Sequence, residues 1–240
     1  VPVLAGDRFT RVSRDEWAGW DRSRGADADV MVRRMTELVL ASSSSSRLKI
    51  LQDAGLDPRV VVPDVDEDTV MDAAFHQHGP LGSADIAVVL ARAKAESVVG
   101  EDALILACDS VLEMDGWTYG KPEDTDDVIK RWQSMRGRSG TLHTGHWLTD
   151  QRSQGTGRSF GAVASTVVHF ADVTDAEIEA YADTGEPLRA VGGFTVDGLG
   201  GAFVSRIDGD YHNVAGLSLP LLRQMLADLG ISWPTLWKHL

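Results

Sequence analysis

Short apolar runs alternate with amphipathic segments along most of this chain, and this alternation limits the fold more than any other feature. The clearest apolar runs cover residues 37–41, 103–108 and 162–170. Between the first two, a helix is predicted over residues 83–98, with Ser83 as its N-cap and apolar residues three and four positions apart. Strands that interleave with helices predict an α/β protein.

The remaining pattern completes a mixed, twisted sheet flanked by helices. Further strands are predicted over residues 60–62, 141–148 and 202–207, a hairpin over 111–119, and helices over 47–54, 125–135, 174–181 and 219–229. The acidic stretch 64–68 could supply a metal ligand or be a solvated loop, and the histidines His76 and His78 are assigned to a polar loop. Cys108 is expected to be a buried thiol that points away from its neighbour Asp109, because side chains alternate along a strand.

Residues 1–34 differ from the rest of the chain. They are charged, are interrupted by Gly and Trp, and have no sustained period. We therefore predict a poorly ordered N-terminal extension over residues 1–34 and one domain over residues 35–240, with Met35 as a candidate native start. A genuine accessory arm is the alternative. No secretory signal and no apolar stretch of about 20 residues is recognised, so a cytoplasmic protein without a membrane segment is expected.

The composition excludes several classes of function. The net charge is −13, and an acidic chain is a poor match for a nucleic-acid polymer, which needs a basic surface. The chain can still bind a small phosphorylated molecule if a few Arg and Lys side chains converge at one site. The single cysteine, Cys108, excludes an internal disulfide and a multi-cysteine zinc site.

Polar residues that follow predicted strands indicate a binding site. Residues 42–46, which include Ser42 and Ser44, are all serine, and Arg47 follows at the start of a predicted helix. A helix N-terminus with a nearby arginine suits an anion such as phosphate. A solvated serine linker is the competing interpretation.

Several charged side chains are candidates for chemistry. Asp109 directly follows a buried apolar run, so it could act as a general base or hold Mg²⁺, or it could simply cap a turn. Lys121 lies between a glycine and a proline and could neutralise a phosphate, although it could also be a surface lysine. Glu67 belongs to the acidic stretch. Of Arg92 and Lys94 on one predicted helix, at most one is expected to face a site.

Taken together, these segments resemble the Maf family over residues 36–229. The resemblance rests on LASSSSSR at 40–47, VPDVDE at 62–67, ARAKA at 91–95, ACDS at 107–110, GKP at 120–122, MRG at 135–137, HTG at 143–145, TGEP at 184–187, VGGF at 191–194, DGLGG at 197–201 and DGDYHNVAGL at 208–217. It implies a fold similar to that of Maf and ITPase-like proteins, with two lobes around a central cleft. A homodimer is the assembly that the resemblance suggests.

The resemblance implies a nucleoside triphosphate pyrophosphatase that releases a nucleoside monophosphate and pyrophosphate. It makes Asp109 the proton acceptor and matches Arg47, Glu67, Lys94 and Lys121 to charged residues needed for activity. It also places Ser42, Ser44 and Ser110 at the substrate, and a divalent cation (Mg²⁺ or Mn²⁺) at Glu67 and Asp109. Housecleaning of nucleotides and a role in cell-division arrest are the expected biological functions.

The chain departs from the family pattern at three places. Ser46 replaces the first arginine of the usual Ser-Pro-Arg-Arg, so one phosphate contact is lost or comes from elsewhere, with Arg92 and Arg138 as candidates. Cys108-Asp109-Ser110 replaces Ala-Asp-Thr, which keeps the hydroxyl. Asp197 replaces the glutamine of the UTP- and dTTP-preferring subgroup. A carboxylate only accepts hydrogen bonds, so it favours a base that presents donors, such as a guanine-type base.

Two alternatives to the enzyme stay open. A nucleotide-binding regulator without turnover is suggested by the loss of an arginine at Ser46. A nucleic-acid-binding module is opposed by the net charge of −13. Because Asp109, Lys121 and Glu67 are all retained, the sequence favours the enzyme.

Overall fold

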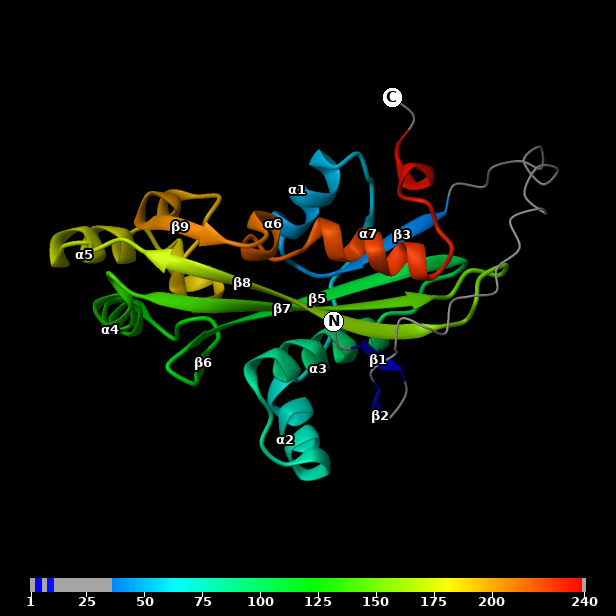
Figure 1. Cartoon of the computed structure of the whole chain (residues 1–240), viewed down its shortest axis with the longest axis horizontal. Helices are drawn as coiled ribbons and strands as arrows, with labels where there is room; N and C mark the ends of the chain where they lie inside the picture. The colour runs from blue at the N-terminus through cyan, green and yellow to red at the C-terminus, as the bar shows by residue number, and fades with distance from the viewer. Residues whose placement is uncertain (1–2, 6–7, 11–35, 239–240) are drawn as a thin grey trace.

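The fold is built around one long sheet (Figure 1). The computed structural model describes residues 3–5, 8–10 and 36–238. The strands are β1 (Val3–Ala5), β2 (Arg8–Thr10), β3 (Glu37–Ala41), β4 (Arg59–Val61), β5 (Ala103–Met114), β6 (Trp117–Tyr119), β7 (Ser139–Asp150), β8 (Ser159–Phe170) and β9 (Val204–Asp208). The α-helices are α1 (Ser45–Asp53), α2 (Glu67–His78), α3 (Ser83–Glu96), α4 (Thr125–Met135), α5 (Asp175–Asp183), α6 (Tyr211–Val214) and α7 (Leu219–Asp228).

Three strands of twelve residues, β5, β7 and β8, form the antiparallel centre of this sheet. The strand order is β2-β1-β8-β7-β5-β3-β4, with β6 added to β5 and β9 added to β8. The strands β3, β4 and the first half of β5 run parallel, so the sheet is mixed, as predicted. Helices α1 and α7 cover one face, α3 covers the other, and α4 and α5 lie at the far end (Figure 1).

The strand β5 joins two elements that the sequence predicts separately. The apolar run suggested a strand that ends at Cys108 before a hairpin over 111–119, but one strand runs through Asp109 and Ser110 to Met114, and its end forms that hairpin with β6. The reason is its neighbour β7, which pairs with β5 from Leu104 to Glu113 and satisfies the backbone along that length. Two polar residues therefore lie in the middle of the central strand.

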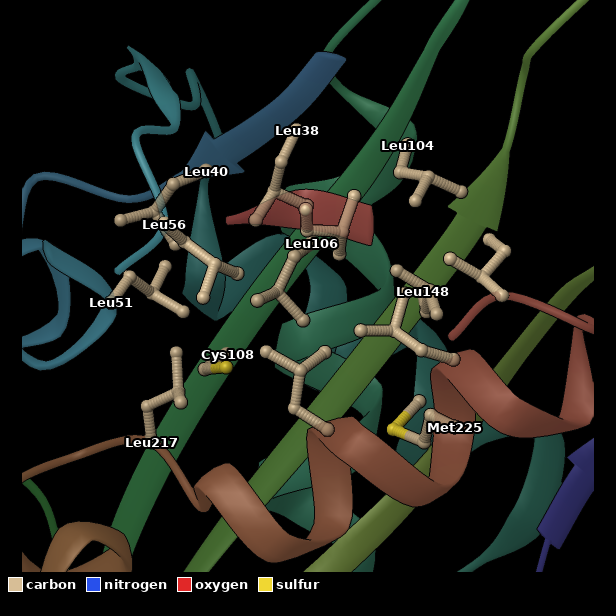
Figure 2. Close-up of a cluster of buried hydrophobic side chains, with 14 of the residues drawn as sticks. Leu38, Leu40, Leu51, Leu56, Leu104, Leu106, Cys108, Leu148, Leu217 and Met225 are labelled. Atoms are coloured by element: carbon tan, nitrogen blue, oxygen red, sulfur yellow. The ribbon is translucent and has the colours of Figure 1, made fainter. Parts of the chain in front are cut away.

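Alternation along the strands produces a separate core on each face. On one face, the even-numbered residues of β3 and β5 (Leu38, Leu40, Leu104, Leu106 and Cys108) pack with α1 and α7 (Figure 2). On the other face, odd-numbered residues such as Val39, Ala41, Ile105 and Ala107 pack against α3. The Cys108 thiol is buried as predicted, and burial raises its pKa to about 12, so it is not a nucleophile at neutral pH.

A third core at the far end of the sheet centres on the buried Trp132 of α4. Its ring meets Phe170, Tyr181 and Phe203 edge to face at 5.6, 5.7 and 5.7 Å between ring centroids. Its indole N–H donates to the carbonyl of Gly193 at 2.8 Å. This one side chain therefore joins α4, β8, α5 and the loop that contains Gly193.

Two helix predictions need correction. The acidic stretch 64–68 and the histidines His76 and His78 were assigned to loops, but α2 begins at Glu67, because the carboxylate of Asp66 accepts from the backbone N–H of Thr69 at 3.1 Å. His76 and His78 therefore lie in its last turn. Ser83 is the first residue of α3 rather than its N-cap, since its hydroxyl bonds to Thr118 at 2.6 Å.

The other predicted elements are confirmed with boundaries shifted by a few residues. The capping box at Thr174 forms with Glu177, and Val128, Trp132 and Met135 are the buried face of α4. The late strand β9 starts at Val204 instead of residue 202, because a 3₁₀ turn occupies Leu199–Phe203. Among the described helices, none combines the length and apolar character needed to cross a membrane.

Most of the predicted N-terminal extension, with Met35, lies outside the described residues. Of the part that is described, β1 pairs with β8, opposing Leu4 to Gly161, and β2 pairs with β1. These two strands extend the sheet beyond β8.

Candidate active site

A cleft of about 820 Å³ opens beside the middle of β5. The first wall comprises residues 42–47, Glu67, Lys94, 109–111 and 214–216, and the second wall comprises residues 120–121 and 186–197. The two parts of the second wall are joined by a hydrogen bond from the N–H of Gly192 to the carbonyl of Gly120 at 2.9 Å.

Arg47 is held rigidly in the first wall. Ser44 caps α1 and accepts from the backbone N–H of Arg47 at 3.3 Å. The guanidinium donates from Nε to the carbonyl of Gly216 at 2.8 Å, from Nη1 to Ser42 Oγ at 3.2 Å and from Nη2 to Ser110 Oγ at 3.1 Å. A guanidinium has five N–H donors, so two are left for an anion in the cleft.

A chain of hydroxyl groups orients Ser110. Its Oγ lies 2.9 Å from Thr144 Oγ1, and the Thr144 hydroxyl donates to the carbonyl of Asn213 at 3.2 Å. Because the Thr144 proton is used in that bond, the Ser110 hydroxyl donates to Thr144 and its oxygen accepts from Arg47. Every proton in the chain is thus assigned, which fixes the Arg47 side chain without a charged partner.

Lys94 joins the two carboxylates of the first wall. Its ammonium group lies 2.7 Å from Glu67 Oε1 and also contacts Asp109 Oδ1. Asp109 and Lys94 have side chains only 12% and 14% exposed, whereas Glu67 is 52% exposed. Burial raises the pKa of Asp109 above its usual value, although Lys94 and Arg47 act in the opposite direction. A carboxylate with a raised pKa is a stronger proton acceptor.

Strand alternation explains how neighbouring residues meet different helices. Asp109 lies on the α3 face of β5 and meets Lys94, whereas Ser110 lies on the α1 face and meets Arg47. Helix α3 approaches closely because Asp109 pairs across the sheet with Gly145, where an added Cβ would lie 2.2 Å from the carbonyl oxygen of Ala87. Any larger residue at position 145 would push α3, and Lys94 with it, away from Asp109.

Lys121 and Arg189 are exposed cations of the second wall. Neither side chain has a hydrogen bond or an ion pair within the described part of the chain. The backbone at Lys121 is nevertheless anchored, because Arg131 donates to the carbonyls of Gly120 at 2.8 Å and Lys121 at 3.4 Å. Sequence reasoning missed Arg189, since no helical or strand pattern points to its position.

Glu186 is a further cleft residue to which the sequence analysis gave no role. Its carboxylate accepts four hydrogen bonds, from two hydroxyls and two backbone N–H groups. Burial acts to raise the pKa of Glu186, but the bonds from Thr195, Gly200 and Leu199 outweigh it and lower the pKa. The signal that could have found this residue is the TGEP segment, which the resemblance already contains.

The structure brings the sequence-predicted site residues to one cleft. Its lining includes Arg47, Glu67, Lys94, Asp109, Lys121, Ser42, Ser44, Ser110, Asp197 and Ser46. The proposed substitutes for the missing arginine are elsewhere. Arg92 pairs with Glu96 at 2.7 Å and lies over Trp147, while Arg138 pairs with Asp115 at 2.5 Å. Of Arg92 and Lys94, which share α3, only Lys94 faces the site, in agreement with the expectation that at most one would.

The two carboxylates suit a divalent cation. Glu67 and Asp109 already share one cationic group, the Lys94 ammonium, and their second oxygens have no side-chain partner among the described residues. Mg²⁺ is commonly held by one or two carboxylates together with substrate phosphates. No group of three or more His, Cys, Asp or Glu side chains placed for a metal occurs within residues that the structure describes. The donor set therefore fits a cation shared with a phosphorylated substrate.

Comparison with known proteins places the chain among relatives. Its residues 37–229 match the model of the family described as Maf, Maf-like protein. Proteins named nucleoside triphosphate pyrophosphatase from Salinispora tropica and Leifsonia xyli are 50% and 46% identical, over 84% of this chain in both cases and 88% and 97% of theirs. A HAM1 protein from Coxiella burnetii is similar at a TM-score of 0.34 and 20% identity, over 58% of this chain and 75% of that one. On the family model and these identities, the chain belongs to the Maf family.

Proposed function

We propose that this chain is a nucleoside triphosphate pyrophosphatase that cleaves between the α- and β-phosphates. The observation that carries the proposal is the buried Asp109 carboxylate, paired with Lys94 in a cleft that also holds Arg47. A base beside fixed cations is what water attack on a polyphosphate requires. The printed names of the Salinispora and Leifsonia relatives support the same activity.

In the proposed reaction, a water molecule attacks the α-phosphorus and gives its proton to the Asp109 carboxylate. The new bond joins the water oxygen to the α-phosphorus. The bond from the α-phosphorus to the oxygen that bridges to the β-phosphorus breaks, and pyrophosphate leaves with the bonding electrons. The products are a nucleoside monophosphate and pyrophosphate, so atoms and charge balance.

The cations of the cleft would hold the triphosphate during this step. Arg47 would offer its two unused N–H donors from a rigid position, and Lys121 would extend a flexible ammonium group from the second wall. Lys94 would keep Asp109 oriented while it takes the proton. A divalent cation, Mg²⁺ or Mn²⁺, held by Glu67 and Asp109 would add charge neutralisation on the phosphates.

Base selection is proposed for the second wall. Asp197 lines the cleft and offers only hydrogen-bond acceptors, which favours a base edge with donors, such as the N1–H and N2–H₂ edge of guanine. Turnover restricted to UTP and dTTP would contradict this choice. Modified nucleotides with the same edge are included in the substrate class, which gives the enzyme a housecleaning role in the cytoplasm, where free nucleotides are found.

The second candidate is a nucleotide-binding regulator with little or no turnover, linked to cell-division arrest. Ser46 favours it, because the cleft has no cation at this position and neither Arg92 nor Arg138 replaces it. For both the enzyme and the regulator, we propose that the chain assembles as a homodimer.

A turnover panel tests the proposal. The purified chain is incubated with each canonical and several modified nucleoside triphosphates, with Mg²⁺ or Mn²⁺, beside the Asp109→Asn variant, and products are separated by chromatography. We expect monophosphate and pyrophosphate from the wild type and neither from the variant. Diphosphate with orthophosphate would contradict the bond assignment. Tight binding without turnover would favour the regulator.

A further inference from the structure

The second wall is organised around one carboxylate. Glu186 Oε1 accepts from the Tyr181 hydroxyl at 3.1 Å, from the Thr195 hydroxyl at 2.5 Å and from the Gly200 N–H at 3.0 Å, and Oε2 accepts from the Leu199 N–H at 3.0 Å. Three of these donors belong to residues 195–200. The side chain of Glu186 is therefore the common acceptor of a segment that is separate from it in sequence.

The segment 195–200 packs closely around the Glu186 carboxylate. An added Cβ at Gly198 would lie 2.6 Å from Glu186 Oε2, and one at Gly200 would lie 2.3 Å from the Tyr181 hydroxyl oxygen. The Tyr181 oxygen also accepts from the backbone N–H of Thr195 at 3.3 Å. Both ends of the segment are thus tied to the same pair of side chains.

Asp197 lies inside this wrapped segment and lines the cleft. Asp197 has no side-chain hydrogen bond or ion pair with another described residue, so the position of its carboxylate depends on the backbone that carries it. We infer that Glu186 is a positioning residue for nucleobase selection, which holds residues 195–200 in the conformation that presents Asp197 to the base. The inference rests on the proposed function for the class of ligand, a nucleoside triphosphate.

The chemistry of the cluster requires a carboxylate at position 186. All four groups around it are donors, and an ionised carboxylate is the side-chain group that only accepts. A glutamine of the same shape would turn an N–H₂ group toward at least one of these donors. The variant Glu186→Gln should therefore release part of the segment while it leaves the volume of the side chain unchanged.

A variant at Tyr181 can distinguish a positioning role of Glu186 from direct contact between Glu186 and the base. Glu186 lines the cleft itself, but Tyr181 is buried and does not line it. Tyr181→Phe removes the hydroxyl that donates to Glu186 and accepts from Thr195, and it leaves Glu186 in place. If Glu186 acts through the segment, both variants should change the same property of the protein.

The experiment measures nucleotide binding in a chain that carries Asp109→Asn. Calorimetry gives the affinities for ATP, GTP, CTP, UTP and inorganic tripolyphosphate, in this background alone and with Glu186→Gln or Tyr181→Phe added. Glu177→Gln is the matched control. Glu177 is an exposed glutamate of α5, the helix that also carries Tyr181, and its hydrogen bonds only cap that helix. Since binding is measured, an inactive wild type would refute the proposed function and leave this test intact.

We expect the affinity ratio between the preferred and the next nucleotide to fall about tenfold in Glu186→Gln. A smaller fall of about threefold is expected in Tyr181→Phe, because the Glu186 carboxylate stays in place and keeps its hydrogen bonds from Thr195, Leu199 and Gly200. Tripolyphosphate affinity should stay unchanged in both variants, and the control should match its parent. Should Glu186→Gln not fold, Tyr181→Phe still decides the question.

Three results would overturn the inference. An equal loss of affinity for all nucleotides and tripolyphosphate would show that Glu186 acts on phosphate binding. Altered selectivity in Glu186→Gln with unchanged selectivity in Tyr181→Phe would mean that Glu186 contacts the base directly. A parent chain that binds the four bases equally would have no selectivity for Glu186 to control.

Discussion

The two walls of the cleft differ in how far their charges are already neutralised by the protein. In the first wall, Arg47 makes three side-chain hydrogen bonds and Lys94 contacts two carboxylates. In the second wall, Lys121, Arg189 and Asp197 make no side-chain hydrogen bond or ion pair with the other described residues. The first wall is therefore held in place before any ligand arrives, whereas the second wall leaves these three charged groups available around the hydrogen-bonded carboxylate of Glu186.

This difference suggests a division of labour. Groups that act on reacting atoms work best when they are oriented in advance, because no reorganisation is then needed during the reaction. Groups that recognise a variable part of the ligand gain more from unpaired donors and acceptors. We therefore assign the chemistry to the first wall and recognition to the second.

Asp109→Asn should abolish most turnover. The amide cannot take the proton from water, so kcat should fall by about a thousandfold or more, measured as pyrophosphate release. Asp53→Asn is the control, since Asp53 is an exposed aspartate paired with Lys49 on α1, and it should keep wild-type kcat. Retention of a tenth of the wild-type rate in Asp109→Asn would remove the general base from the account.

His146, which lies behind the first wall, should make the folded protein less stable in acid. This buried imidazole accepts from the backbone N–H of Ser218 at 2.9 Å, and its Nδ1 lies 3.0 Å from the carbonyl oxygen of Thr144. Burial lowers its pKa from 6.5 to about 4. As the pH falls from 6.5 to 4, the unfolded chain takes up a proton that the folded chain refuses, so the free energy of unfolding should decrease by about 3 kcal/mol.

Urea unfolding at several pH values measures this loss. The comparison is with His146→Gln, which lacks the titrating group, and with His78→Gln, an exposed histidine of α2. The wild type and His78→Gln should lose more stability between pH 6.5 and pH 4 than His146→Gln does. Three parallel pH profiles would contradict the assignment of a neutral His146.

Lys121→Ala should weaken catalysis without any effect on stability. Its exposed ammonium group has no partner to lose in the described structure, so the change acts on the ligand alone. We expect kcat/KM to fall between about tenfold and a hundredfold. Arg138→Ala removes an exposed cation that pairs with Asp115 outside the cleft, and it should change kcat/KM less than about twofold. Equal effects of the two variants would mean that only net charge matters.

Ser46→Arg should give the smallest effect. It restores the arginine of the family pattern at a half-buried position in the cleft. One added charged hydrogen bond to a phosphate should raise kcat/KM about fivefold. Ser134→Arg, on the exposed side of α4, controls for the added charge on a chain of net charge −13. An unchanged kcat/KM would mean that the cleft does not need a cation at position 46.

The sequence predicted the first wall better than the second, for a physical reason. Arg47, Lys94 and Asp109 lie on regular elements, where alternation and helical spacing say which way a side chain points. Arg189 ends a three-residue 3₁₀ turn and Glu186 directly precedes it, and the geometry of such a turn depends on contacts that no local pattern encodes. The buried Trp132, which holds Gly193 from α4, is such a contact.

The errors within the fold have a similar origin. The continuity of β5 through Asp109 and Ser110 comes from pairing with β7, a partner far along the chain. The helix α2 was missed because its only buried residue is Ala74, so it has almost no apolar period. Its N-cap, Asp66, was read as one more acid in a charged stretch. Polar local sequence therefore hid the helix α2, which is the element that carries Glu67.

The most direct test of the division of labour compares Asp109→Asn and Tyr181→Phe over one nucleotide panel, with turnover and affinity measured together. The account predicts that Asp109→Asn loses turnover on every nucleotide and keeps the wild-type order of affinities. It predicts that Tyr181→Phe keeps kcat on the preferred nucleotide within about twofold while its selectivity falls about threefold. If Asp109→Asn reorders the affinities, or if Tyr181→Phe lowers kcat as much as selectivity, the two walls do not divide the work.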